Sequence, residues 1–216
     1  MTREEIVDVI IERLGKRTDL EDQIIVELKE VQRTKCEGHH WLPWFCITEN
    51  QTVSTTADEE RVPVPTDFLM EDDNQALWIV NENGKDLELK KDDLDVIKAR
   101  TADTETDDSD TGQPEYYDLV GDYFILRPIP DDVYTLRLRC MSRLATLSSD
   151  SSENGWTTHA TDVLIYETCA VMAREYLKDT ESAEGFEARA KQAWDRLYRK
   201  HIAREEAGRM RQQGED

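Results

Sequence analysis

The sequence predicts an α+β fold: a helical bundle base from both chain ends, with a β-rich insertion (a hairpin plus a meander) between the second and third helices. Two observations support this prediction. Apolar residues recur at helical spacing near the chain ends, whereas the middle holds short β-prone runs separated by turn dipeptides. Residues 1–35 are expected to form an N-terminal helical hairpin, residues 36–150 the insertion, and residues 151–216 the C-terminal helices and a basic tail.

Two helices are expected in the first 35 residues. Thr2 with Glu5 forms a capping-box pattern before the first apolar stripe, and Thr18 with Glu21 repeats it before the second. Gly15 lies between the stripes and is expected to end the first helix. The stripes recur at helical spacing: Ile6, Val9, Ile10 and Leu14, then Leu20, Ile24, Leu28 and Val31.

The chain changes to a β-type pattern after residue 40. Residues 41–48 are aromatic and β-prone, and residues 51–56 can supply a partner strand. Residues 62–65 alternate valine with proline and are expected to be extended, because proline disfavours helix at the residue before it. Thr66 and Asp67 are candidate caps of a short helical turn.

A β-hairpin is predicted around Asn83-Gly84, a dipeptide suited to a type I′ turn, with strands over residues 76–82 and 85–91. The pairs brought together by this turn are Glu82 with Lys85, Val80 with Leu87, and Trp78 with Leu89. The four apolar members share one face, which is expected to be buried. A short helix over residues 92–100 follows.

The segment 101–118 contains seven acidic residues and no basic one, and residues 101–114 are expected to form a mobile, solvated loop. A β-meander follows, with Gly121-Asp122 as a type II′ turn. That turn sets Leu119 opposite Phe124 and Tyr117 opposite Leu126. After a second turn, residues 133–141 return as a strand with Tyr134, Leu136, Leu138 and Cys140 on one face, and Arg137 and Arg139 on the other.

Two long helices are expected to close the chain. The first begins within residues 158–162 and is apolar on more than one side, so it is buried centrally or shared with a neighbouring subunit. Its candidate subunit-interface residues are Ile165, Cys169, Met172 and Tyr176. The second begins near Ser182, with a stripe of Phe186, Ala190, Ala193, Trp194 and Leu197 that fades beyond Ile202.

The net charge of the chain excludes several functions. The 216 residues include 48 acidic and 27 basic ones, which gives a formal charge of −21. This argues against ordinary duplex-DNA binding, in which basic side chains displace counterions from phosphates. No apolar run approaches the ~18 residues of a membrane span, and the N-terminus lacks the pattern of a signal peptide.

Residues 189–211 are a basic exception, with eight basic and three acidic residues. Two interpretations are open: a solvated helix face with incidental charge, or a tail that docks on an acidic surface of another protein and orders on binding. Docking is the favoured interpretation. The candidate docking residues are Arg196, Arg199, Lys200, Arg204, Arg209 and Arg211.

Residues with reactive side chains give no enzymatic signal. Cys36, Cys46, Cys140 and Cys169 form no C-x-x-C pair and are expected to be small buried hydrophobes in a reducing compartment. Cys36, His39, His40 and Cys46 are zinc-type ligands, but their spacing matches no common zinc pattern. No metal, cofactor or catalytic residue is therefore predicted, and His159 and His201 are expected to have capping or surface roles.

Several segments together resemble the head-to-tail adaptor (connector) proteins of tailed bacteriophages. They are Arg13-Leu14-Gly15, Glu30-Val31-Gln32, Pro43-Trp44-Phe45, VPTDFL at residues 64–69, YDLVGDYFILRPIPD at residues 117–131, Trp156, and Ile165-Tyr166-Glu167. The resemblance covers nearly the whole chain in order. The departures are Cys46 and Cys140, where larger apolar residues are expected, and the acidic loop at residues 101–114.

The resemblance implies a virion protein without enzymatic activity. Members of the family form a ring, usually of twelve subunits, below the portal protein, and they extend the channel through which the genomic DNA passes without specific binding. A tail or nozzle protein attaches to the other side. The resemblance therefore implies assembly in the host bacterial cytoplasm, no membrane contact, and a C-terminal helix that reaches toward the portal.

Two other functions are weighed against the adaptor. An acidic DNA mimic would explain the net charge, but it explains neither the basic tail nor the long β-rich insertion. A cell-wall hydrolase acting during phage entry would need a cleft that holds one protonated carboxyl group near neutral pH. The adaptor is the favoured function.

Overall fold

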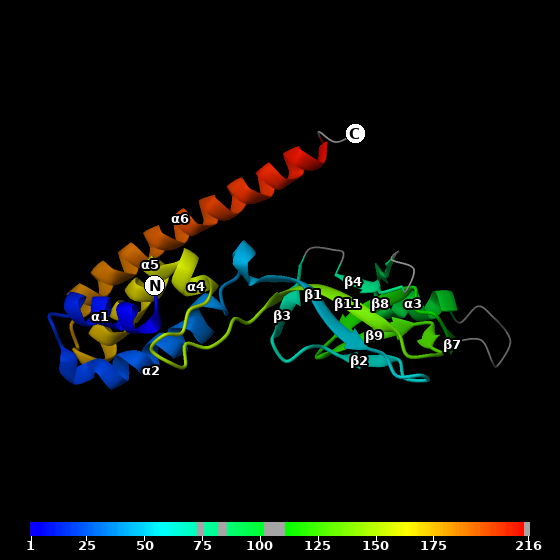
Figure 1. The fold of residues 1–216 in the computed structure, drawn as a ribbon, viewed down its shortest axis with the longest axis horizontal. Coiled ribbons are helices and arrows are strands. Elements are labelled where there is room, and N and C mark those ends of the chain that lie inside the picture. The colour runs from blue at the N-terminus through cyan, green and yellow to red at the C-terminus, as the bar shows by residue number, and fades with distance from the viewer. Residues whose placement is uncertain (73–75, 82–85, 102–110, 214–216) are drawn as a thin grey trace. The chain divides into compact units, whose positions relative to one another are not determined.

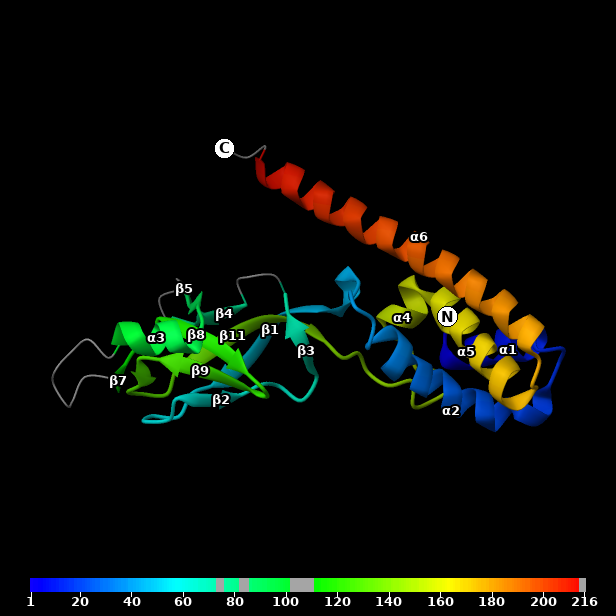
Figure 2. The ribbon, with the colours of Figure 1, turned by 180° about the vertical axis from the view of Figure 1, so that it is seen from behind.

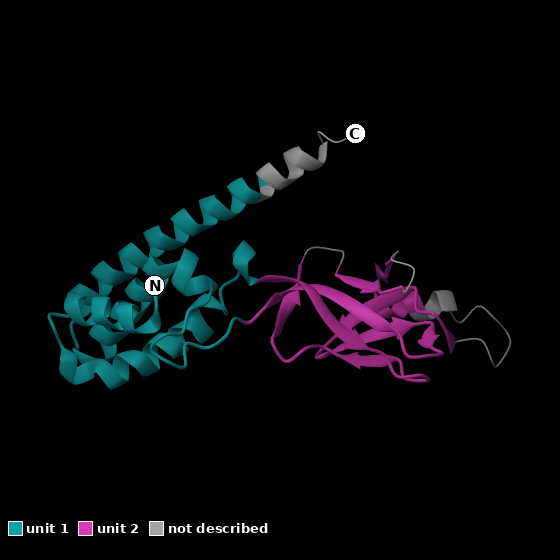
Figure 3. Ribbon diagram, in the orientation of Figure 1, with its two compact units in different colours: residues 1–46, 144–216 teal, residues 47–143 magenta. Residues whose placement is uncertain are grey.

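The computed structural model describes residues 1–72, 76–81, 86–101 and 111–213. The chain divides into two compact units, which Figure 3 shows in different colours. Unit 1 comprises Met1–Cys46 and Leu144–Asp216, and unit 2 comprises Ile47–Arg143. Unit 1 is helical and unit 2 holds the sheets, so the predicted α+β class is confirmed. Residues 36–46 and 144–150, which were expected in the insertion, belong to unit 1.

Unit 1 is built around a central helix. Its α-helices are α1 (Arg3–Arg13), α2 (Glu21–Val31), α4 (Gly155–His159), α5 (Thr161–Val171) and α6 (Thr180–Gln213). Helix α5 contacts each of the other four, as the two opposite views in Figures 1 and 2 illustrate. The two-sided apolar pattern of α5 thus buries it centrally within its own unit.

The predicted start of the first helix is confirmed. The Thr2 hydroxyl accepts a hydrogen bond from the Glu5 N–H, and the Glu5 side chain accepts one from the Thr2 N–H. The second capping box is wrong. Thr18 begins a 3₁₀ turn, η1 (Thr18–Leu20), and α2 starts directly after it without a side-chain cap. A tight turn therefore takes the place of the expected cap.

Unit 2 contains two main sheets. In the first sheet, the order is β1 (Ile47–Ser54), β11 (Thr135–Ser142), β4 (Leu77–Ile79) and β5 (Leu87–Glu88), and β3 (Phe68–Glu71) also pairs with β11. In the second sheet, the order is β2 (Arg61–Pro63), β9 (Tyr123–Arg127), β8 (Tyr116–Val120) and β6 (Lys90–Lys91). A small parallel pair joins β7 (Thr111–Gly112) to β10 (Ile129–Pro130), and α3 (Leu94–Thr101) packs near β8 and β9.

The predicted meander is half right. The β8–β9 hairpin has the expected register, with Leu119 opposite Phe124 and Tyr117 opposite Leu126, and Gly121 has the positive φ of 61° that the turn requires. The third strand is not in this sheet, because β11 pairs with β1, β3 and β4 instead. The predicted alternation within β11 is confirmed by the buried side chains of Leu136, Leu138 and Cys140.

The predicted register of the β4–β5 pair is wrong by one residue. Ile79 lies opposite Leu87 and Trp78 lies opposite Glu88. Because side chains alternate across a strand, this shift exchanges the two faces of β4, where Leu77 and Ile79 are buried and Val80 is 40% exposed. On the partner segment, Leu89 is buried as predicted, whereas Leu87 is 40% exposed. The Asn83-Gly84 turn lies outside the described residues.

Two further expectations for the middle of the chain, at residues 41–48 and 66–67, differ from the structure. Instead of a strand over residues 41–48, Trp44–Cys46 forms a 3₁₀ turn (η3) and one strand, β1, follows it. Residues 66–67 form a turn before β3 rather than a helical cap, and the Asp67 carboxylate accepts a hydrogen bond from Gln51 at 2.6 Å. Most of the acidic loop, residues 102–110, lies outside the described residues.

Candidate functional site

The basic segment predicted to dock on a partner lies in helix α6, which continues as far as Gln213. The inner part of the helix packs on unit 1 through its predicted apolar stripe. Four of the stripe positions are buried: Ala190, Ala193, Trp194 and Leu197. The basic residues therefore extend along one continuous helix that is anchored at its start, rather than forming an irregular tail.

Two of the predicted docking arginines pack against unit 1 itself. The Arg196 guanidinium donates a hydrogen bond to the Asp162 carboxylate at 3.0 Å. The guanidinium carbon of Arg204 lies 4.3 Å from the centroid of the Trp44 ring. A guanidinium held over an aromatic face is attracted by the ring quadrupole. These two arginines thus fasten α6 to its own unit.

Arg199 and Lys200 are the predicted docking residues that remain available to a partner. Both side chains are exposed, and within the described part of the chain neither forms a hydrogen bond or an ion pair. Arg209 and Arg211 also lie in α6, but their side chains fall outside the described residues. Exposed cations on a helix can form charge-assisted hydrogen bonds with carboxylates of another protein.

An aromatic cluster fixes the middle of α6. The Trp194 ring stacks on the His39 ring with 4.0 Å between centroids, and the Trp41 ring stacks on His201 at 5.6 Å. Tyr198 meets Trp41 edge-on at 5.2 Å. Burial, followed by the nearby His40, lowers the pKa of His39. The His39 ring is therefore mostly neutral at about pH 7.

Sequence reasoning missed this cluster. It assigned residues 41–48 to a strand and His201 to a capping or surface role, whereas His201 is buried. The available signal was compositional: aromatic and histidine residues are concentrated at residues 39–45 and again at residues 194–201. Such a concentration on two separate segments is typical of side chains that pack against one another.

The predicted subunit-interface residues lie mostly inside unit 1. Ile165, Cys169 and Met172 are buried, so their side chains present no surface to a second subunit. Tyr176 is 41% exposed, and its hydroxyl donates a hydrogen bond to Glu27 at 2.9 Å. Of the four, only Tyr176 keeps a side chain that a neighbouring subunit could contact.

The four cysteines are free and buried, as predicted. Burial raises the pKa of Cys46 and of Cys169 to about 12, and it raises the pKa of Cys36 and Cys140 as well. Within the described residues, no group of three or more His, Cys, Asp or Glu side chains could hold a metal ion. Cys36, His39, His40 and Cys46 accordingly do not converge on a common point.

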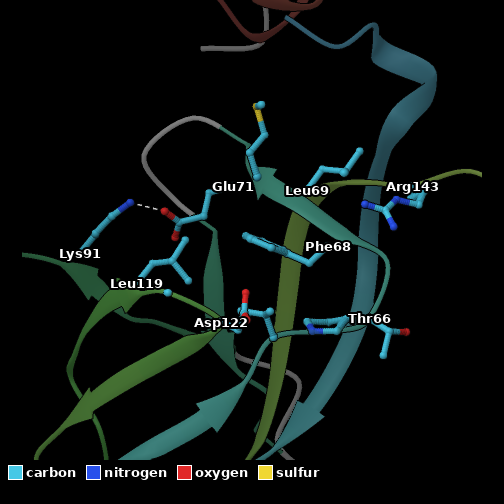
Figure 4. Close-up of a pocket in the computed structure, with 12 residues that line it drawn as sticks. Thr66, Phe68, Leu69, Glu71, Lys91, Leu119, Asp122 and Arg143 are labelled. Carbon is cyan, nitrogen blue, oxygen red and sulfur yellow. Dashed lines mark hydrogen bonds and ion pairs between the residues drawn. The ribbon is translucent and has the colours of Figure 1, made fainter. Parts of the chain in front are cut away.

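A cavity of about 890 Å³ lies in unit 2 beside strand β3 (Figure 4). Phe68, Leu69 and Leu119 give it apolar walls, and the Glu71 carboxylate forms an ion pair with Lys91. Burial, followed by the charge of Glu71, raises the pKa of the adjacent Tyr117. The Glu71 carboxylate is thus partnered by Lys91 at the edge of this groove.

Among the described residues, none of the helices combines the length with the apolar character that a membrane span needs. Two comparisons with known proteins bear on the identity of the chain. A family model described as SU10 adaptor protein matches residues 1–215. No curated protein matches the chain.

Proposed function

The chain belongs to the SU10 adaptor protein family, and from that premise we propose that twelve copies form a ring at the head-to-tail junction of a tailed bacteriophage. The family match over residues 1–215 is the observation that carries the proposal, and it confirms the resemblance found in the sequence. The chain is then a structural virion component, assembled in the host bacterial cytoplasm, with no catalytic role.

Helix α6 makes the contact with the portal protein in this proposal. It is anchored on unit 1 by Trp194 and Leu197, and beyond them it carries the exposed cations Arg199 and Lys200. Complementary charge sets orientation and speeds association more than it adds affinity. A helix with these cations therefore suits an acidic surface of the portal.

The net charge suits a channel through which DNA moves. At −21 for each chain, twelve copies carry about −250 charges, a large negative field even after screening by salt. DNA binds a protein when cations on the protein release counterions from its phosphates. A predominantly acidic ring repels the phosphates instead, so the genome passes without specific binding.

Closure of the ring needs a heterologous contact, in which one surface of a subunit meets a different surface of the next. Of the four proposed interface residues, Tyr176 is the exposed one and can take part in such a contact. Val26 on α2 is also exposed and can contribute to it. Since neighbouring copies repel one another at −21 each, we expect the ring to form on the portal rather than in solution, where the isolated chain is a monomer.

The test is binding of the full chain to purified portal protein from the same virus, with a double variant, Arg199→Ala with Lys200→Ala. Its affinity is expected to fall by up to about tenfold, and less so as salt rises, because exposed ion pairs contribute little and are screened. The control, Arg33→Ala with Arg61→Ala, removes two exposed cations elsewhere. Equal losses in the two double variants, or no binding by the wild-type chain, would contradict the proposal.

Point substitution is a cleaner test than truncation. His201 is buried beside Trp41, and Arg204 packs on Trp44, so a deletion that begins at Arg199 also removes part of the aromatic cluster. A loss of attachment after that deletion would not separate lost charge from lost packing.

Electron microscopy of the particle gives an independent readout of the proposal. Twelve copies of the chain are expected below the portal, and a position away from the DNA exit route would overturn the proposal.

A further inference from the structure

A second cavity, of about 600 Å³, lies in unit 1 beside the middle of α6. The rings of Trp41, Trp194, Tyr198 and His39 form part of its walls, and charged residues form much of the rest. A cavity of this size lies within the range that holds a residue-sized ligand. The proposed ring and docking contacts do not involve this cavity.

The aromatic walls are held in place before any partner arrives. Trp194 stacks on His39, and its indole N–H donates a hydrogen bond to Glu167 at 3.1 Å. Trp41 meets Trp194 edge-on at 5.6 Å. Tyr198 contributes a large exposed face, since 47% of its surface is accessible. Tryptophan and tyrosine in a preformed pocket are the residue types that dominate binding energy at protein interfaces.

The charges around this cavity favour an acidic partner. Lys35 and Lys191 are exposed, and within the described residues neither has an ion pair. Among the acidic lining residues, Glu187 is bound to Arg174 at 2.7 Å. Glu167 accepts a hydrogen bond from the neutral Trp194 indole and keeps its charge, so Glu167 and Asp195 balance the two lysines within the lining. The additional positive charge beside the cavity comes from Arg199, which is exposed and, within the described residues, has no ion pair.

The cavity is continuous with the proposed docking surface. Arg199 follows Asp195 by four residues and Tyr198 follows Lys191 by seven, so these positions share one side of α6. A partner that contacts Arg199 therefore reaches the mouth of the cavity along the same helix. A single surface then combines an aromatic pocket with a cationic rim, the arrangement of an interface core surrounded by polar groups.

We infer that this cavity receives an aromatic or large aliphatic side chain from an acidic segment of the portal protein, whose carboxylates bind Lys35 and Lys191. The inference rests on the proposed function, since it names the chemistry of the partner at the same contact. The buried side chain supplies most of the affinity, and the lysines and Arg199 set its orientation.

Two variants test the pocket against purified portal protein, at about 50 and 200 mM salt. Tyr198→Ala is expected to weaken binding at least tenfold at both salt concentrations, because it removes an apolar contact. Lys191→Gln is expected to weaken binding mainly at the lower concentration. Tyr198→Phe should bind as the wild type does, and Tyr123→Ala, which removes an exposed aromatic side chain from unit 2, is the matched control.

The outcomes separate this inference from the proposed function. If Tyr198→Ala and Lys191→Gln bind as tightly as the wild type while the Arg199/Lys200 double variant binds weakly, the pocket is overturned and the docking role stands. If the wild type itself does not bind, both fail. Tryptophan fluorescence gives a second readout that does not depend on a destabilising variant. Portal binding should change the emission of the wild type and of Tyr198→Phe, and an unchanged emission on binding would overturn the inference about the pocket.

Discussion

The guanidinium carbon of Arg204 lies 4.3 Å from the centroid of the Trp44 ring. Trp44 belongs to the turn that precedes β1, whereas Arg204 follows the last buried residue described in α6, His201. The contact joins positions far apart in the sequence, and it removes one cation from those available to a partner. It also extends the anchored part of α6 by nearly one helical turn beyond His201.

Replacing Arg204 with alanine is expected to lower the free energy of unfolding by about 0.5–1 kcal/mol, the usual contribution of an exposed cation–π pair. The measurement is urea denaturation followed by tryptophan fluorescence, which reports mainly on unit 1 because four of the five tryptophans lie there. Arg199→Ala is the control on the same helix. Equal stability of the two variants would mean that the contact between Arg204 and the aromatic ring of Trp44 contributes nothing to stability.

Gln32→Leu is expected to cost about 1–3 kcal/mol of unfolding free energy, because it leaves buried polar groups without partners. The Gln32 side chain is buried, donates to Glu37 at 3.0 Å and accepts from the Asn154 amide at 3.2 Å. Urea denaturation followed by tryptophan fluorescence measures the unfolding free energy of this variant. Gln23→Leu, at an exposed position of α2, the helix that ends just before Gln32, should change stability by less than half as much; a comparable loss would contradict the argument.

Features set by neighbouring residues could be predicted from the sequence. The Thr2–Glu5 capping box and the β8–β9 hairpin are both confirmed, and each depends on a few consecutive residues. In the hairpin, the two-residue turn at Gly121 fixes the register, so Leu119 must face Phe124. The apolar stripe of α6 was predictable for the same reason, since helical periodicity is local.

Features set by distant partners could not be predicted. β11 is not part of the meander sheet because it pairs with β1, β3 and β4. No local sequence pattern indicates which strands it pairs with. The docking site shows the same limit. Composition identified the basic segment, but only the structure separates Arg196, which is bound to Asp162, from Arg199, which is exposed. The aromatic pocket escaped prediction because its walls come from segments about 150 residues apart.

The stability of unit 1 is expected to fall as the pH drops through the range in which His39 titrates. Burial lowers the pKa of His39 from the usual 6.5, so the folded protein takes up this proton less readily than the unfolded chain does. The neutral ring therefore contributes its full stability above pH 6.5, and that stability is lost as the pH falls from 6.5 through the lowered pKa of His39 in the folded protein.

The variant His39→Phe tests this, because it keeps a ring that can stack on Trp194 but cannot titrate. A smaller drop for this variant in unfolding free energy between about pH 7.5 and 5.5 is expected; parallel curves would exclude His39 as the titrating group.

The four thiols are expected to be unreactive in the native protein. The thiolate is the nucleophile, and burial raises the pKa of Cys46 and Cys169 to about 12, so at about pH 8 only about one such thiol in ten thousand is ionised. Burial also raises the pKa of Cys36 and Cys140. A disulfide reagent such as 5,5′-dithiobis(2-nitrobenzoate) should release its chromophore from four thiols in guanidinium chloride and from almost none under native conditions. Residual native labelling should then proceed at the rate of unfolding, so it should accelerate in Gln32→Leu if that variant unfolds faster. Rapid native labelling of one cysteine would show that its thiol is accessible, contrary to the packing of the helices around Cys169 and of the turn at Cys46.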